Sequence, residues 1–534
     1  MTLGRAPRQG DLLDDITRFC DAAVGKDSIY ALLHRERDRL FPDEFFADLF
    51  ADVGRRSVPP SVVATVMVLQ RLEGLSDREA VERFTFDARW RYAAGLGGYD
   101  SQGPIRFAHT VLVDMRERLR RSTRPDRVFE VTLRTASAAG VVGRRRVLDS
   151  TPLYDAVATM DTVTLIRSAL RGLLAVAGRR EAGLRAACTS GDDYASTAKP
   201  QIDWEDAAAR EALIDSRARD AFGCLALLEG EQLSPEVSQA AHLLAAVVGQ
   251  DLEKGEDGGF RIARRVAPDR IISTVDPEAR HGHKTDARSF DGYKGHVAID
   301  PDGEVITALA VTAGNVGDAS VAAELVRDCL GFQADAAHNE PGVPFEVYGD
   351  SAYGAGSVLS DLHRGGVLAM VKVAAASAPQ GRFTKDEFVI DLVARTVTCP
   401  NQVTVSYRLN PKGEGIACFR AACRGCPLRE RCTASTSTKG RAIGIGPHEE
   451  HLAAGRRRQQ DAAWRKSYRA TRPKVERKLA HLMRRRHGGR RSRMRGRWRV
   501  AQDFAWLGAA VNLARLAVLG ARSTASGGWA IGGC

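Results

Sequence analysis

The sequence predicts an α/β protein in which an all-helical N-terminal domain precedes a mixed sheet. Three observations indicate this fold class. Apolar residues recur at helical spacing between residues 62 and 84. Alternating apolar residues on both sides of Asp300-Pro301-Asp302-Gly303 predict a β-hairpin within residues 291–318. Two short apolar runs, at 147–151 and 345–350, each lead to an aspartate, and strand ends are where α/β proteins place polar functional groups.

The composition is that of an ordinary globular protein with room for two to four domains. The chain has 534 residues, of which 44% are hydrophobic and 27% charged. The formal net charge of +12 favours a polyanionic partner. Between residues 464 and 499 there are sixteen Lys and Arg residues and one acid, Glu476. Because like charges repel, this density is difficult to explain as a solvated surface alone.

Targeting signals are not evident. Residues 1–15 are polar and acidic and lack the apolar segment of a secretory signal. The apolar run at 504–519 is interrupted by Asn512 and Arg515, which favours a packed helix over a membrane span. Ten cysteines without an export signal suggest a reducing compartment. We therefore expect a cytoplasmic protein associated with the nucleoid, and no membrane partner.

Residues 1–140 form the predicted helical domain. Ser57-Val58-Pro59-Pro60-Ser61 is typical of a helix start, and Ser76 can cap a second helix after the break at Gly74. Two short helices across a glycine turn resemble a helix-turn-helix, a DNA-binding motif. A plain helical hairpin explains the pattern equally well. The arginines expected on the outside are Arg78, Arg83, Arg89 and Arg91.

Residues 141–519 contain the predicted catalytic domain, and 520–534 a flexible tail. In order, the predicted elements are a strand at 141–152, a helical insertion at 153–285, the hairpin at 291–318, a helix at 319–330, a strand at 345–349, a helix at 358–363, a strand at 367–373, a Cys-rich insertion at 374–463 and a final helix from about 471. This is the order of a ribonuclease H-like core with a mixed five-stranded sheet. Its first and fourth strands are adjacent, which would bring Asp149 and Asp350 together.

The third acid, Glu476, flanks the apolar face of the final helix and can therefore reach inward. Two Mg²⁺ ions can clamp the attacking and leaving oxygens of a phosphodiester, and hard cations prefer carboxylate ligands. We therefore expect Asp149, Asp350 and Glu476 to bind Mg²⁺ or Mn²⁺ for chemistry on double-stranded DNA. The alternative for Asp350 is a plain helix cap. The arginines expected to contact phosphates are Arg469, Arg472, Arg477, Arg484, Arg490, Arg491, Arg493 and Arg495.

The Cys-rich insertion contains a second possible metal site. Cys423-x-x-Cys426, with Cys399 before it and Cys432 after it, has the composition of a four-thiolate structural zinc site. The alternative is a set of unpaired cytoplasmic thiols. Cys418 is a spare that can replace one of the four.

In this order the motifs resemble bacterial insertion-sequence transposases of the DDE class, particularly the subgroup called IS eleven-eighty-two. The resemblance covers nearly the whole chain. Its motifs are Arg55-Arg56-Ser57-Val58-Pro59-Pro60, Val147-Leu148-Asp149-Ser150-Thr151, Gly292-Tyr293-Lys294-Gly295-His296, Thr312-Ala313-Gly314-Asn315-Val316-Gly317-Asp318, Tyr348-Gly349-Asp350-Ser351-Ala352-Tyr353-Gly354, the Cys-x-x-Cys region, and Lys474-Val475-Glu476-Arg477-Lys478 followed by His487-Gly488.

The resemblance implies that Asp149, Asp350 and Glu476 are the catalytic acids and Mg²⁺ the cofactor. It further implies that the N-terminal helices bind terminal inverted repeats, and that a homodimer cleaves DNA strands and transfers them to target DNA. Many relatives carry a tyrosine and an arginine before the glutamate, roles that Tyr468 and Arg472 can fill. Many relatives also carry a lysine about two turns after the glutamate. Met483 stands at that position here, and Arg484 is the candidate substitute.

Two other functions remain open. One is a catalytically inactive relative that binds element ends as a repressor. The other is a ribonuclease H-like nuclease without strand transfer. All three acids are intact, which favours the enzyme over the repressor. The helical N-terminal domain and the basic C-terminal helices favour the transposase over the nuclease.

Overall fold

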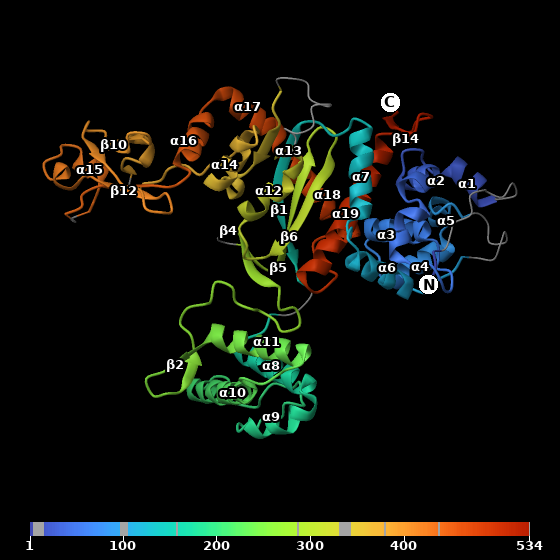
Figure 1. Cartoon of the computed structure of the whole chain (residues 1–534), viewed down its shortest axis with the longest axis horizontal. Coiled ribbons are helices and arrows are strands. Elements are labelled where there is room, and N and C mark those ends of the chain that lie inside the picture. The colour runs from blue at the N-terminus through green and yellow to red at the C-terminus, as the bar shows by residue number, and fades with distance from the viewer. Residues whose placement is uncertain are drawn as a thin grey trace.

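The computed structural model describes residues 1–3, 15–96, 105–155, 159–285, 288–330, 343–378, 381–435 and 438–532. Helices at the N-terminus and a long helix near the C-terminus pack beside a central sheet (Figure 1). A helical insertion and a Cys-rich module project from the sheet on different sides. The catalytic candidates lie on the sheet and on helices that follow the Cys-rich module.

The N-terminal domain is helical, as predicted. Its elements are α1 (Asp15–Ala23), α2 (Ile29–Leu40), the 3-10 helix η1 (Asp43–Leu49), α3 (Pro60–Glu73), α4 (Asp77–Phe86), α5 (Ala88–Ala93), α6 (Thr110–Arg121) and α7 (Arg127–Ala138). Gly74 ends α3 with a left-handed φ of 69°. Ser76 caps α4 and Glu79 completes a capping box. The predicted boundary between the two helices is therefore confirmed.

The four arginines predicted on the outside of these helices are not all exposed. Every residue of α3 from Pro60 to Arg71 is buried, so this helix belongs to the core. Arg91, predicted on the outside, is 3% exposed, and its guanidinium lies 5.7 Å from the ring centre of Phe84. That prediction is wrong because α5 turns Arg91 toward the aromatic core. Arg78 and Arg83 are exposed on α4.

The central sheet has six strands, not the five predicted. They are β1 (Arg145–Tyr154), β4 (Arg280–Thr285), β5 (Arg288–Asp300), β6 (Val305–Ala313), β7 (Glu346–Gly349) and β8 (Leu368–Val371). The order runs β5-β1-β7-β8, and both β4 and β6 pair with β5. Strand β1 is antiparallel to β5 and parallel to β7, and β8 is parallel to β7. The predicted adjacency of the first and fourth core strands is confirmed by the pairing of Arg145–Val147 with Glu346–Tyr348.

Two element boundaries were predicted incorrectly. The first strand runs from Arg145 to Tyr154 and not from 141 to 152, so Asp149 lies in its middle. The predicted helix at 319–330 is broken into η3 (Asp318–Val321), α12 (Ala322–Leu325) and α13 (Arg327–Leu330), because Val326 leaves the helical conformation with φ −116° and ψ 21°. The helix after β7 is confirmed as α14 (Gly356–Arg364), preceded by the 3-10 turn η5 (Ser351–Tyr353).

The helical insertion has its own hydrophobic core. It contains α8 (Thr162–Val176), η2 (Gly178–Arg180), α9 (Glu181–Ala187), α10 (Ala207–Leu228) and α11 (Pro235–Asp251). It is not helical throughout, because β2 (Leu252–Lys254) and β3 (Phe260–Ile262) form a hairpin and β4 joins the main sheet.

The Cys-rich module is built from short elements and leads into three helices. Its elements are η7 (Lys385–Glu387), β9 (Val389–Asp391), β10 (Thr396–Thr398), β11 (Thr404–Ser406), β12 (Gly415–Cys418), η8 (Arg420–Cys423), α15 (Arg429–Cys432) and β13 (Ala442–Ile445). The helices that follow are α16 (Glu449–Arg458), α17 (Ala462–Thr471) and α18 (Pro473–Leu482), and the 3-10 turn η9 (Arg485–His487) comes after them.

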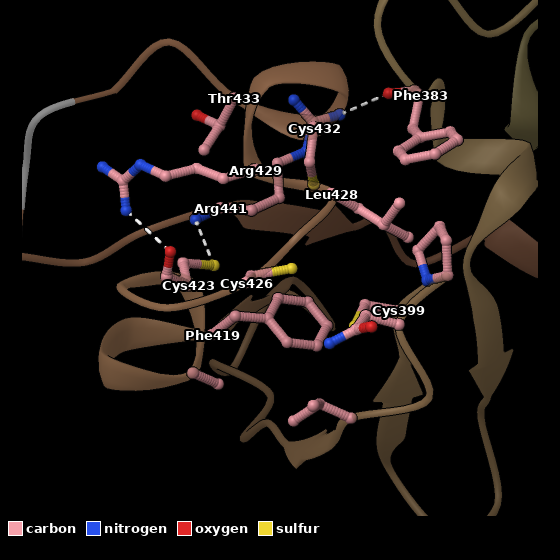
Figure 2. Close-up of a pocket in the computed structure, with 14 residues that line it drawn as sticks. Phe383, Cys399, Phe419, Cys423, Cys426, Leu428, Arg429, Cys432, Thr433 and Arg441 are labelled. Carbon is pink, nitrogen blue, oxygen red and sulfur yellow. Dashed lines mark hydrogen bonds between the residues drawn. The ribbon is translucent and has the colours of Figure 1, made fainter.

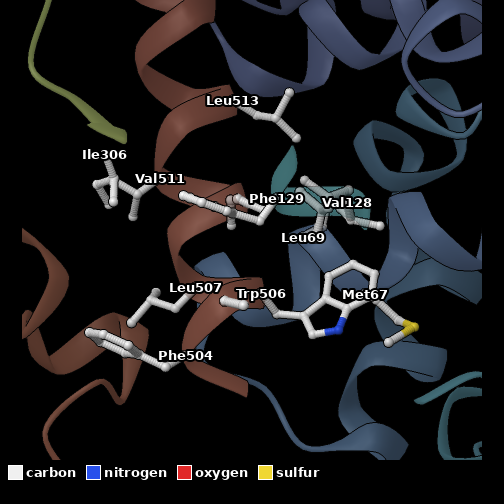
Figure 3. Packing of buried hydrophobic residues seen from close by; sticks show 14 of the residues in the cluster. Met67, Leu69, Val128, Phe129, Ile306, Phe504, Trp506, Leu507, Val511 and Leu513 are labelled. Atoms are coloured by element: carbon white, nitrogen blue, oxygen red, sulfur yellow. The ribbon is translucent and has the colours of Figure 1, made fainter. Parts of the chain in front are cut away.

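The main core surrounds α19 (Arg497–Val518), which lies between the N-terminal helices and the sheet. Figure 3 shows Phe504, Trp506, Leu507, Val511 and Leu513 of α19 together with Met67, Leu69, Val128, Phe129 and Ile306. Asn512 is fully buried and its amide bonds both the N–H and the carbonyl of Ile306, at 2.8 and 2.9 Å. One helix therefore ties the two predicted domains into one core.

The described part of the C-terminal tail is a hairpin of β14 (Ala521–Ser523) and β15 (Trp529–Ile531), so the predicted flexible tail is wrong there. The Ser523 N–H donates to Glu36 of α2 at 3.0 Å, which fixes the hairpin to the N-terminal helices. Among the helices that the structure describes, none is long and apolar enough to span a membrane.

Candidate active site

The three predicted acids face one guanidinium. Arg472, between α17 and α18, lies 3.0 Å from Asp149, 3.4 Å from Asp350 and 3.5 Å from Glu476, measured between side-chain nitrogen and oxygen atoms. The side chain of Arg472 is 8% exposed. Residues that are more than three hundred positions apart in the sequence therefore meet at one point.

Each acid reaches this point from a different element. Asp149 projects from within β1, and its Oδ1 accepts the N–H of Ser150 at 2.8 Å. Asp350 follows β7; its Oδ1 accepts the N–H of Ala352 at 3.0 Å, while its Oδ2 faces Arg472. Asp350 is thus both the cap considered as its alternative role and a member of the cluster. Glu476 lies in the first turn of α18.

The exposure of the acids decreases toward the sheet. The side chains of Glu476, Asp350 and Asp149 are 65%, 42% and 14% exposed. Burial raises the pKa of Asp149, although attraction to Arg472 opposes this shift. Burial would lower the pKa of Arg472, but the attraction of Asp149 and then of Asp350 outweighs burial and raises it. The cluster therefore holds a permanent positive charge among three carboxylates.

Helix α17 is bonded directly to the end of β7. The hydroxyl of Tyr468 donates to the carbonyl of Gly349 at 3.2 Å, one residue before Asp350. The ring of Tyr468 stacks on Trp464, with 4.8 Å between centroids and 11° between planes. The hydroxyls of Tyr348 and Ser467 are also 2.8 Å apart. These contacts fix the position of Arg472 relative to Asp350.

The acids line an open cleft of about 510 Å³. Its wall includes Lys284 of β4, Arg288 of β5 and Arg490, three cations that face the same space as the acids. Neither Lys284 nor Arg288 was among the predicted site residues. The residues of β4, Arg-His-Gly-His-Lys-Thr, show no apolar alternation, and Arg288 follows them at the start of β5. The position of Lys284 and Arg288 just before a clearly predicted hairpin is the signal that could have indicated them.

The predicted phosphate-contacting arginines fall into two groups. Arg469, Arg477, Arg484, Arg490, Arg491 and Arg495 are exposed. Arg472 is buried among the acids, and Arg493 is half-buried and donates to the carbonyl of Leu75. Arg477 pairs with Glu304. Met483 lines the cleft, whereas Arg484, its suggested substitute, is not among the described lining residues.

The carboxylates are suitable ligands for a hard cation, but a cation already stands between them. Within the described ranges, no three His, Cys, Asp or Glu side chains are placed to hold a metal ion. At the acidic cluster the guanidinium of Arg472 accounts for this, because it bonds to Asp149 and Asp350 itself. An ion could bind there only if Arg472 moved away from the acids.

Two family models match the chain. Residues 18–118 match a transposase domain (DUF772), and residues 398–517 match a transposase DDE domain. Both matched segments are transposase domains, and the second is of the DDE class. The first match covers most of the N-terminal helices, and the second runs from the Cys-rich module through α19 and includes Glu476. No curated protein and no solved structure matches it significantly.

Proposed function

We propose that Asp149, Asp350 and Glu476 are the catalytic acids of this transposase and bind Mg²⁺ or Mn²⁺ during DNA strand cleavage and strand transfer. The observation that supports this most strongly is their convergence on Arg472, because three carboxylates gather at one point only where positive charge balances them. The strand order, with β1 parallel to β7 and antiparallel to β5, supports a ribonuclease H-like core.

The donor set fits hard divalent ions, since all three side chains offer carboxylate oxygen. Such ions, when bound, would activate the attacking oxygen and stabilise the leaving oxygen of a phosphodiester. The chain itself must provide orientation and charge. Asp149 and Asp350 are fixed by backbone N–H groups, and Glu476 is free to adjust on the exposed turn of α18.

In this proposal Arg472 exchanges partners. With no ion present it neutralises the acids. If the acids held a divalent ion, the planar guanidinium would be available to two oxygens of the scissile phosphate, a geometry that arginine suits better than lysine. Its Nε is buried without a hydrogen-bond partner in the described structure, so this donor of the guanidinium is not used in a hydrogen bond.

The DNA would follow the cationic wall of the cleft. Lys284, Arg288 and Arg490 line it beside the acids, and exposed arginines continue along α17, α18 and the segment after η9. These contacts would give salt-dependent affinity for double-stranded DNA. We assign recognition of terminal inverted repeats to the N-terminal helices and membership of the IS eleven-eighty-two subgroup to the chain. A homodimer would hold two element ends and the target.

The test uses linear DNA carrying the flanking repeats of the chain's own locus, with Mg²⁺ and mapping of nicks and joined products. Glu476→Gln and Asp350→Ala should bind these ends with wild-type affinity and lose cleavage. The matched control is Glu211→Gln, which changes an exposed glutamate on α10. It should cleave normally.

Each alternative has its own outcome. Cleavage that persists in Glu476→Gln and Asp350→Ala would refute the assignment of the acids. Wild-type protein that binds the ends without cutting them would favour the repressor. Nicking that never leads to joined products would favour the nuclease.

A further inference from the structure

The hydrophobic core of the Cys-rich module is small for the number of residues that the module contains. Its buried residues form one cluster of nine, centred on the hairpin β12–β13 and the strand β10. These residues are Phe388, Val397, Tyr407, Ala417, Phe419, Cys423, Cys432, Ile443 and Ile445. Its strands are three or four residues long. Modules of this size usually need disulfides or a bound metal, because their hydrophobic core alone contributes little stability. The cysteines that the structure describes are free, so disulfides do not supply this stability.

Four of the five cysteines in this module line one small pocket. Figure 2 shows Cys399, Cys423, Cys426 and Cys432 around it, arriving from three separate segments. The fifth, Cys418, ends β12 opposite Ala442 and does not line the pocket. The cavity volume is about 20 Å³, which is room for about one water-sized occupant.

The backbone is shaped around these sulfurs. After Cys399, a tight turn through Gln402, with φ of 60°, returns the Gln402 N–H to the Cys399 carbonyl at 2.9 Å. The Arg441 N–H donates to the Sγ of Cys423 at 3.4 Å. Gly440 has φ of 63°, and a Cβ there would lie 3.0 Å from that Sγ. The chain therefore approaches Cys423 more closely than a side chain at position 440 would allow.

Two arginines hold the backbone around the pocket. Arg429 donates to the carbonyls of Cys423 and Ser435, at 2.8 and 2.9 Å, and Arg441 donates to the carbonyl of Phe383 at 3.1 Å. Both arginines line the pocket.

We propose that Cys399, Cys423, Cys426 and Cys432 bind one structural zinc ion, and that Cys418 is not a ligand. Four thiolates in tetrahedral arrangement are the usual closed structural site for Zn²⁺. The four thiols are not yet gathered closely enough to hold an ion. Binding therefore draws them inward across the small cavity.

The ion would stabilise the support of the catalytic helices. Asp386, in η7 of the module, pairs with Arg456 of α16 at 2.7 Å, and Lys385 beside it pairs with Glu449, which is 5% exposed. Helix α16 leads through α17 to Arg472 and Glu476. Loss of the ion should therefore loosen the module first and the docking of α16 second.

The experiment uses the full chain purified without chelators. We expect elemental analysis to find one zinc per chain. After chelation under reducing conditions, Co²⁺ should restore one equivalent with the thiolate-to-cobalt charge-transfer absorption. Zinc-free wild-type protein that takes up no Co²⁺ with this absorption would overturn the proposal, and so would iron in place of zinc.

Two matched variants separate the ligands from the spare. Cys426→Ser should lose most of the bound zinc, whereas Cys418→Ser should retain one equivalent. Equal retention or equal loss in both variants would contradict the ligand set. Because the wild-type measurements do not depend on either variant folding, the proposal stays testable. Trypsin should cut chelated protein between β8 and α16 before it cuts elsewhere, and unchanged cleavage would contradict the structural role.

Discussion

Arg472→Gln tests the balance of charge on which the candidate active site depends. The substitution keeps a polar side chain but removes the one charge that, among the residues described, contacts Asp149, Asp350 and Glu476 together. In metal-free protein it leaves three carboxylates without their shared partner. We expect lower stability without metal, and a larger stabilisation by Mg²⁺ than in the wild-type protein.

The magnitude follows from the exposure of each acid. Losing one partner of a buried ion pair costs about 3–5 kcal/mol, whereas an exposed pair contributes about 0–1 kcal/mol. Only Asp149, at 14% exposed, approaches the buried case; Asp350 and Glu476 are 42% and 65% exposed. We therefore expect a loss of about 2–3 kcal/mol, or a fall in Tm of roughly 2–3 °C.

The effect of Mg²⁺ follows by linkage. In the wild-type protein an ion must displace Arg472 from the acids, and this opposes binding. In Arg472→Gln the ion does not have to displace an arginine. The stability added by a saturating ion should therefore exceed the wild-type value by about 2–3 kcal/mol.

The assay is thermal unfolding with and without MgCl₂, with Arg469→Gln as the control, since Arg469 is an exposed arginine on α17. The control should unfold like the wild-type protein under both conditions. An equal or smaller Mg²⁺ shift in Arg472→Gln than in the wild type would refute the reasoning, because the acids would then not form the ion site.

Two further predictions concern pH and salt. Burial lowers the pKa of His296 to about 4 from an unfolded value near 6.5, so the unfolded chain binds the proton more tightly; stability should fall by about 2 kcal/mol between pH 7.5 and 5. Unfolding measured at both pH values should show a smaller fall in stability for His296→Gln than for the control His242→Gln, which changes an exposed histidine. An equal fall in the two variants would show that His296 is not the source of the pH dependence. The double variant Lys284→Ala/Arg288→Ala should weaken DNA binding and reduce the slope of log affinity against log salt by about 2. An unchanged slope, equal to that of the exposed-site control Lys199→Ala, would remove these residues from the DNA path.

Much of the fold follows from patterns that are local in the sequence. The capping box at Ser76, the hairpin around Asp300-Pro301 and the strand before Asp350 are each set by neighbouring residues, and each lies where predicted. Strand β4 was missed because its residues lack the apolar alternation that marks a strand. It is held instead by its pairing with β5, a contact that no local pattern encodes.

The sequence by itself identified the residues to which we assign the chemistry in our proposals: three acids, a dense set of arginines and a cysteine cluster. It could do so because residue type, spacing and charge are visible along the chain. Only the tertiary structure decided that Arg472 neutralises the acids, that Arg91 and Arg493 are taken up by internal contacts, and that Cys418 lies outside the cysteine pocket. Those outcomes depend on the distances between segments far apart in the chain, and these distances are fixed by packing around α19 and by pairing of β1 with β7.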